Sequence, residues 1–169
     1  MEKTSNKIEI PQELRETVRN TMRAAGALGP LGAFSTMGDV AAIAGCWGTL
    51  LVVFADHYGM KMTKETAVKA CSSVLLGIGS YYAGCKLASR LFNMIPFAGT
   101  VMGMGISSAA NILFTYRFAL TLTRMFGSAC GDLDNIVASI VEMFKTYGAI
   151  GSAADAFRML IGDDLAGRF

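Results

Sequence analysis

Three long stretches without a charged residue constrain this chain more than any other feature. They cover residues 40–55, 70–85 and 91–116, and Pro96 interrupts the last of them. Apolar residues make up 53% of the chain and charged residues 17%, against about 25% in ordinary globular domains. The mean hydropathy is +0.44. So few charged residues are not enough to form the surface of an ordinary soluble monomer. We therefore expect the apolar stretches to be covered by lipid or by other subunits.

The spacing of apolar residues near the N-terminus predicts an amphipathic helix. Pro11 is expected to open it, because the missing N–H of proline costs nothing at the first position of a helix. The stretch Gly26–Pro30 is expected to end it. The predicted buried face consists of Leu14, Val18, Met22 and Ala25.

Further helices are predicted downstream, and no alternating strand pattern competes with them. Asp39 is expected to cap the second helix, and Thr63 is expected to begin the third. The second is expected to end at Asp56, His57 and Gly59. The predicted helices after the first cover 40–55, 63–90, 97–126, a short segment from Asp132 or Asp134 to Phe144, and 153–161.

The sequence therefore predicts an all-α fold, a bundle of about five to six helices whose central three are strongly apolar and rich in glycine. The predicted organisation is an amphipathic N-terminal helix and lead (1–30), an apolar helical core (31–127) and short amphipathic C-terminal helices (128–169).

The lengths of the apolar stretches bear on whether the chain crosses a membrane. A spanning helix needs about 20 apolar residues at 1.5 Å each. The uncharged stretches 40–55 and 70–85 fall short of this, although flanking Lys86 and Arg90 could extend toward headgroups. The stretch 97–116 is long enough. If all three crossed, the two sides would hold seven and eight basic residues, which gives no positive-inside bias. Partial insertion, or burial in an oligomer, therefore remains open.

Charge is distributed unevenly, although the net charge is only +2. Residues 61–131 carry seven basic side chains and one acidic one, and residues 132–169 carry three basic and six acidic. A basic, apolar middle suits an anionic lipid surface, and chance in a charge-poor chain explains the pattern equally well. Nucleic acid is not expected as a partner, because no strong positive field exists. The candidate lipid-headgroup contacts are Lys86, Arg90, Arg117 and Arg124, of which the last two could alternatively bind an acidic partner.

Two predicted helices carry small residues at four-residue intervals. One set is Gly99, Gly103 and Ser107, and the other begins with Ala41 and Gly45 and continues to Thr49. Small residues on one helix face let a second helix approach closely, in lipid and in tightly packed soluble bundles alike. Asn111 extends the first set and is expected to hydrogen-bond across a helix interface. We interpret all of these residues as packing or association positions, not as ligand positions.

Residues that could carry catalysis are scarce. His57 is the only histidine, and it lies at a predicted helix end, where a solvated or capping imidazole is typical. The four cysteines lack paired spacing and lie among small or apolar residues, which is typical of buried free thiols in a reducing compartment. We expect no catalytic residue, no metal site and no cofactor. The polar N-terminus predicts no secretory signal peptide.

A set of short motifs covers residues from about Gly29 to Phe126. They are Gly29-Pro30-Leu31-Gly32, Gly38-Asp39, His57-Tyr58-Gly59, Thr63-Lys64-Glu65, Ile95-Pro96-Phe97-Ala98-Gly99-Thr100 and Thr115-Tyr116-Arg117. In these motifs the chain resembles the helical family called DUF697, whose members occur alone or attached to GTPase domains and include proteins described as membrane proteins. The resemblance implies a helical, membrane-associated module and brings no catalytic residues with it.

The leading interpretation is a membrane-associated structural or scaffolding protein that assembles with copies of itself on the reducing, cytoplasmic side. Its partners would be lipid and further copies of the chain, together with a protein that the sequence does not identify. The alternative is a soluble homo-oligomer that buries its apolar helices between subunits.

Overall fold

The computed structural model describes residues 8–29, 36–77, 98–128, 138, 140–142 and 153–161. These residues contain no strand, so the predicted all-α class is confirmed. The predicted helix 153–161 has the same bounds as the last helix of the structure. The helices are α1 (Gln12–Ala27), α3 (Thr36–His57), α4 (Lys64–Gly77), α6 (Ala98–Gly127) and α8 (Ala153–Ile161), with a short helical segment at 140–142.

Helix α1 begins where the sequence predicts. Pro11 is the N-terminal cap residue, and its carbonyl oxygen accepts a hydrogen bond of 3.0 Å from the N–H of Leu14. The helix ends at Ala27, within the predicted glycine-rich stretch. The predicted inner face is confirmed, because all four of its residues are at most 3% exposed: Leu14, Val18, Met22 and Ala25.

The start of α3 differs from the prediction, and its end agrees. The helix begins at Thr36, so the prediction that Asp39 caps it is wrong. Once a helix is nucleated, each further residue adds one hydrogen bond, and the helix therefore continues back past Asp39. At the other end, Gly59 has a φ of +77°. The N–H of Met60 bonds to the carbonyl of Ala55 at 2.8 Å, and that of Gly59 bonds to Asp56 at 3.0 Å. This is a Schellman ending, which requires the left-handed conformation that glycine tolerates best.

Helix α4 has the predicted threonine at its start. The Thr63 hydroxyl oxygen accepts the N–H of Thr66 at 3.2 Å and lies 2.9 Å from the hydroxyl of Thr66. The first N–H groups of a helix have no acceptor within the helix, and this hydrogen bond supplies one for the N–H of Thr66.

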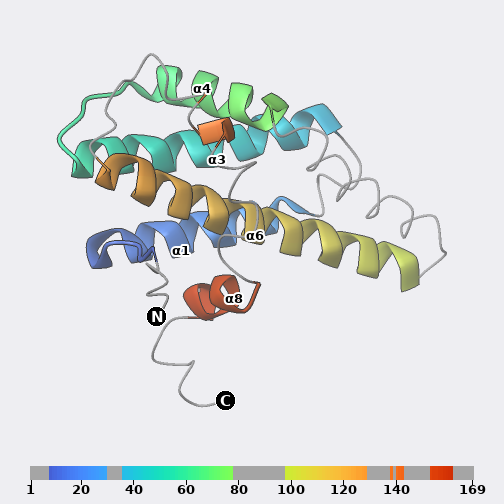
Figure 1. The fold of residues 1–169 in the computed structure, drawn as a ribbon. Coiled ribbons are helices and arrows are strands. Elements are labelled where there is room, and N and C mark those ends of the chain that lie inside the picture. The colour runs from blue at the N-terminus through green and yellow to red at the C-terminus, as the bar shows by residue number, and fades with distance from the viewer. Residues whose placement is uncertain are drawn as a thin grey trace.

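Helix α3 occupies the middle of the bundle. It packs most extensively against α4, and it also contacts α1 and α6, which pack against each other (Figure 1). The short α8 contacts α1 and α6 and lies on the far side of them from α4 (Figure 1). The core therefore draws residues from all three predicted parts of the chain.

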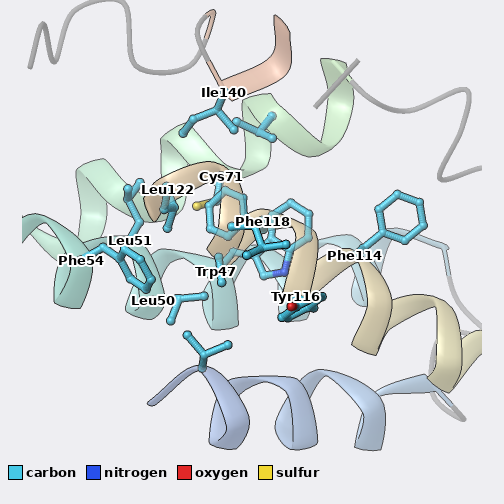
Figure 2. Packing of buried hydrophobic residues seen from close by; sticks show 14 of the residues in the cluster. Trp47, Leu50, Leu51, Phe54, Cys71, Phe114, Tyr116, Phe118, Leu122 and Ile140 are labelled. Carbon is cyan, nitrogen blue, oxygen red and sulfur yellow. The ribbon is translucent and has the colours of Figure 1, made fainter. Parts of the chain in front are cut away.

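Large side chains from α3 and α6 fill the centre (Figure 2). The indole of Trp47 stacks on the ring of Phe118, with centroids 4.3 Å apart and planes at 8°. The indole N–H donates a hydrogen bond of 3.0 Å to the hydroxyl of Thr115. Both aromatic side chains are fully buried. Tryptophan can be buried in this way because its one polar atom has an acceptor.

Candidate functional site

The small-residue face predicted on α6 lies partly within the bundle. Gly99 and Gly103 belong to this helix, but their surroundings are outside the residues that the structure describes. Ser107 and Asn111 are both at most 1% exposed. The face continues to Thr115, which is also fully buried and accepts the indole N–H described above. Its described part is thus a buried polar stripe, which fixes how α6 meets its neighbours.

Asn111 makes the predicted hydrogen bond across a helix interface. Its side-chain N–H group donates to the carbonyl oxygen of Ala25 at 3.0 Å, near the end of α1. Two glycines beside this bond let the helices meet. A Cβ added to Gly29 would lie 2.5 Å from the backbone nitrogen of Ser108, and one on Gly26 would lie 2.9 Å from Ile112. The α6 stripe therefore serves packing within one chain.

Replacing Asn111 by alanine is expected to lower the free energy of unfolding by about 0.5–1.5 kcal/mol for the lost hydrogen bond. The carbonyl of Ala25 keeps a second donor, the N–H of Leu28 at 3.2 Å, so the change does not leave this carbonyl without a hydrogen bond. Denaturant unfolding followed by circular dichroism measures it. Ser73→Ala is the control, because Ser73 is exposed and its hydroxyl bonds only within its own helix. Equal effects of the two changes would contradict this role of Asn111.

The second predicted face, on α3, points out of the bundle. Ala41 and Thr49 are exposed, and a Cβ added to Gly45 would meet no atom within 4 Å. The close approach on this helix is made instead by Gly48, where an added Cβ would lie 2.6 Å from a Val68 methyl and 3.0 Å from the Val68 Cα. Four-residue spacing thus identifies an α3 face that none of the other described helices fills.

This outward face is long and largely apolar. It starts at Ala41 and ends at Asp56, because residues at these spacings follow one side of a helix. Near its end lies an open hollow of about 430 Å³, formed with the turn between α3 and α4. The hollow is lined by Val52, Val53, Asp56, Met60, Lys61 and Met62.

Helix α3 is also the one helix among the described residues that is long and apolar enough to cross a membrane. The segment Val40–His57 has 18 residues and a mean hydropathy of 1.6. Only 44% of it is buried inside the molecule. Length and composition alone do not separate a membrane helix from the core helix of a soluble protein, so the exposed part of α3 is the more informative observation.

The predicted headgroup contacts are only partly placed. Lys86 and Arg90 lie outside the described residues. Arg117 and Arg124 are half-buried in α6, so they do not project freely from the surface as a solvated edge would. Their contact with lipid stays a prediction.

A second, smaller cavity lies where α8 meets α1 and α6. It measures about 130 Å³ and brings Arg15, Tyr116, Asp155 and Arg158 together with the chain before α1. Burial and the negative charge of Asp155 raise the pKa of Tyr116, and Arg15 opposes that shift. Within α8, the Asp155 Oδ1 and Arg158 Nη1 atoms lie 3.8 Å apart. The raised pKa keeps Tyr116 a neutral phenol at neutral pH.

Two arginines of α1 fasten α8 beside this cavity. Arg19 donates a hydrogen bond of 2.9 Å to the carbonyl oxygen of Met159, and Arg23 donates one of 3.3 Å to that of Leu160. Both carbonyls lie in the last turn of α8, where carbonyl groups lack partners within the helix and cations are favoured. These charges therefore hold the fold together, and sequence reasoning missed them because the contact joins residues about 140 positions apart.

The structure also places the histidine and two of the four cysteines. His57 is exposed at the end of α3, and its ring lies nearly perpendicular to that of Tyr58 with centroids 5.0 Å apart. Cys46 and Cys71 are free thiols, as predicted, and Cys85 and Cys130 lie outside the described residues. Within the described ranges, no group of three His, Cys, Asp or Glu side chains could hold a metal ion.

Burial raises the pKa of the Cys71 thiol to about 12. In an unfolded chain the thiol would lose its proton near its ordinary pKa of 9.0, so above that pH the folded protein binds more protons than the unfolded one. The free energy of unfolding should therefore fall as pH rises from 9 toward 12. Denaturant unfolding across this range, compared with Cys71→Ala, checks it: the variant should lose less stability with pH. Equal slopes in the two proteins would contradict the buried thiol.

Compared with protein-family models, curated proteins and solved structures, the chain shows no match. The resemblance to DUF697 therefore stays a prediction, and no residue of this chain takes a role from a relative.

Proposed function

We propose that this chain is a membrane-associated helical protein that assembles with copies of itself and has a structural or scaffolding role without catalysis. The observation that carries the proposal is the half-buried state of α3. A segment of 18 residues with a mean hydropathy of 1.6 is only 44% buried. Every exposed apolar Å² costs about 25 cal/mol relative to burial. A large exposed apolar face usually marks a site of contact with protein or membrane.

Lipid is a suitable cover for the outward face of α3. Between Ala41 and Val53 the face carries alanine, glycine, threonine and valine and no charge. An apolar helix face with charges only at its ends can lie in the boundary between headgroups and acyl chains. Self-assembly is the second cover, because small side chains allow another helix to come close.

The opposite side of α3 supports a second candidate function, a soluble homo-oligomer. Ile43, Trp47, Leu50 and Phe54 are at most 1% exposed, and α3 contacts α1, α4 and α6. A helix packed on several neighbours resembles the core helix of a soluble protein more than one surrounded by lipid. In this alternative only further copies of the chain cover the outward face.

Membrane fractionation with carbonate extraction separates the candidates. We expect the full chain to sediment with membranes and to remain there after carbonate treatment, because apolar contacts do not depend on charge. Recovery as a dispersed oligomer without detergent would favour the soluble candidate. Recovery as a dispersed monomer would contradict both.

A further inference from the structure

The hollow at the end of α3 is lined by four apolar side chains, one acidic side chain and one basic side chain. The half-buried side chains of Val52, Val53, Met60 and Met62 supply the apolar part. Methionine side chains adapt their shape to a partner surface, and this makes them common at binding faces. The hollow is open to the outside and measures about 430 Å³.

Asp56 and Lys61 stand in this hollow, and both are exposed. Within the described part of the chain, neither of them belongs to an ion pair. An acid and a base on one surface allow that surface to be complementary to a second copy of itself. In a two-fold dimer, residue i meets residue j of the partner and j meets i, so the same two residues form two equivalent pairs.

We propose that this hollow is the docking surface for a second copy of this chain, with Asp56 of each copy facing Lys61 of the other. The inference rests on the self-assembly in the proposed function and names the surface that performs it. The apolar side chains provide the contact area, and the two charge pairs set the orientation. The outward face of α3 continues from the hollow through Thr49 and Gly45, where an added Cβ would meet nothing, so the second copy has room to extend along the helix.

The charge of Asp56 favours a second copy over lipid as the occupant. A carboxylate is unfavourable in hydrocarbon and is repelled by the anionic surface that membranes present. A cation from the facing copy removes both problems. The hollow therefore fits protein, and lipid can cover the uncharged part of α3 nearer to Ala41.

A charge-swap cycle on the full chain tests this surface. Asp56→Lys places two lysines opposite each other at both symmetric positions, and Lys61→Asp does the same with two acids. The dimer dissociation constant, measured by sedimentation equilibrium in mild detergent, is expected to rise about tenfold in each single variant, because attraction becomes repulsion at two contacts. The double variant Asp56→Lys/Lys61→Asp restores both pairs, and its constant should return to the wild-type range.

Lys69→Asp is the matched control, because Lys69 is exposed on α4 and does not line the hollow. It should leave the dissociation constant unchanged. All of these residues are exposed, so circular dichroism should show the same helix content in every variant. If the single variants assemble as strongly as the wild-type chain, this docking surface is wrong, and self-assembly must use another part of the molecule. A double variant that stays as weak as the single ones would overturn the pairing. A wild-type chain that stays monomeric at every concentration would overturn the self-assembly of the proposed function itself.

Discussion

Replacing Trp47 by alanine is expected to lower the free energy of unfolding by about 3–5 kcal/mol, the range for removing a large aromatic side chain from a packed core. The indole is fully buried, stacks on Phe118 at 4.3 Å and donates its N–H to Thr115. Removing it leaves a cavity between α3 and α6 and deprives the hydroxyl of Thr115 of its donor. Denaturant unfolding followed by circular dichroism measures the change.

The variant Trp47→Phe separates the two contributions. It keeps an aromatic ring to stack on Phe118 and removes the indole N–H, so its loss should be well below that of Trp47→Ala. A loss below about 1 kcal/mol for Trp47→Ala, the typical effect of an average mutation, would contradict a central position for this side chain.

Two glycines three residues apart in α3 are expected to respond in opposite directions to replacement by alanine. At Gly48 an added Cβ would come within 3.0 Å of the Val68 backbone and 2.6 Å of a Val68 methyl, so α4 must move away. Overpacking of this kind costs about 1–3 kcal/mol. At Gly45 nothing lies within 4 Å, so alanine adds only its better helix propensity, a gain of up to about 1 kcal/mol.

Each glycine is the control for the other, because both lie inside the same helix and both changes add one methyl group. The midpoint of thermal unfolding should fall for Gly48→Ala and stay equal or rise for Gly45→Ala. A parallel change in the two variants would mean that helix propensity, and not the contact between α3 and α4, decides the outcome.

Local sequence signals predicted the helices well. Pro11, Thr63 and Gly59 each act on the backbone within a few residues, and each lies where its chemistry predicts a helix start or end. The apolar spacing of α1 predicted its buried face for the same reason. Asp39 was misleading, because the sequence offers a suitable cap residue there while the preceding residues are helical as well.

Contacts between helices were only partly predictable. Four-residue spacing identified faces of small residues on α3 and α6, but it could not tell which of them meets another helix. The described part of the α6 face meets α1 through Asn111, whereas the α3 face at Gly45 points outward and Gly48 makes the close contact. Gly26 and Gly29 were read as a helix end, and they also admit α6. Such pairings join distant parts of the chain, and no local pattern encodes them.

The outward face of α3 could not be predicted from composition either. The sequence shows an uncharged stretch from Val40 to Ala55, and that pattern fits a fully buried helix equally well. The packing of α1, α4 and α6 against α3 is needed to show which of its residues the described helices leave uncovered.

Flotation of the purified full chain with lipid vesicles tests most directly whether the outward face of α3 binds a membrane. The matched variant is Ala41→Asp/Thr49→Asp, which places charge at two exposed positions of the outward face that lie outside the hollow. We expect the wild-type chain to float with vesicles in high salt and the variant to remain largely at the bottom of the gradient, because a charged face cannot enter the lipid boundary. A wild-type chain that stays at the bottom without aggregating, or a variant that floats as well as wild type, would contradict the account.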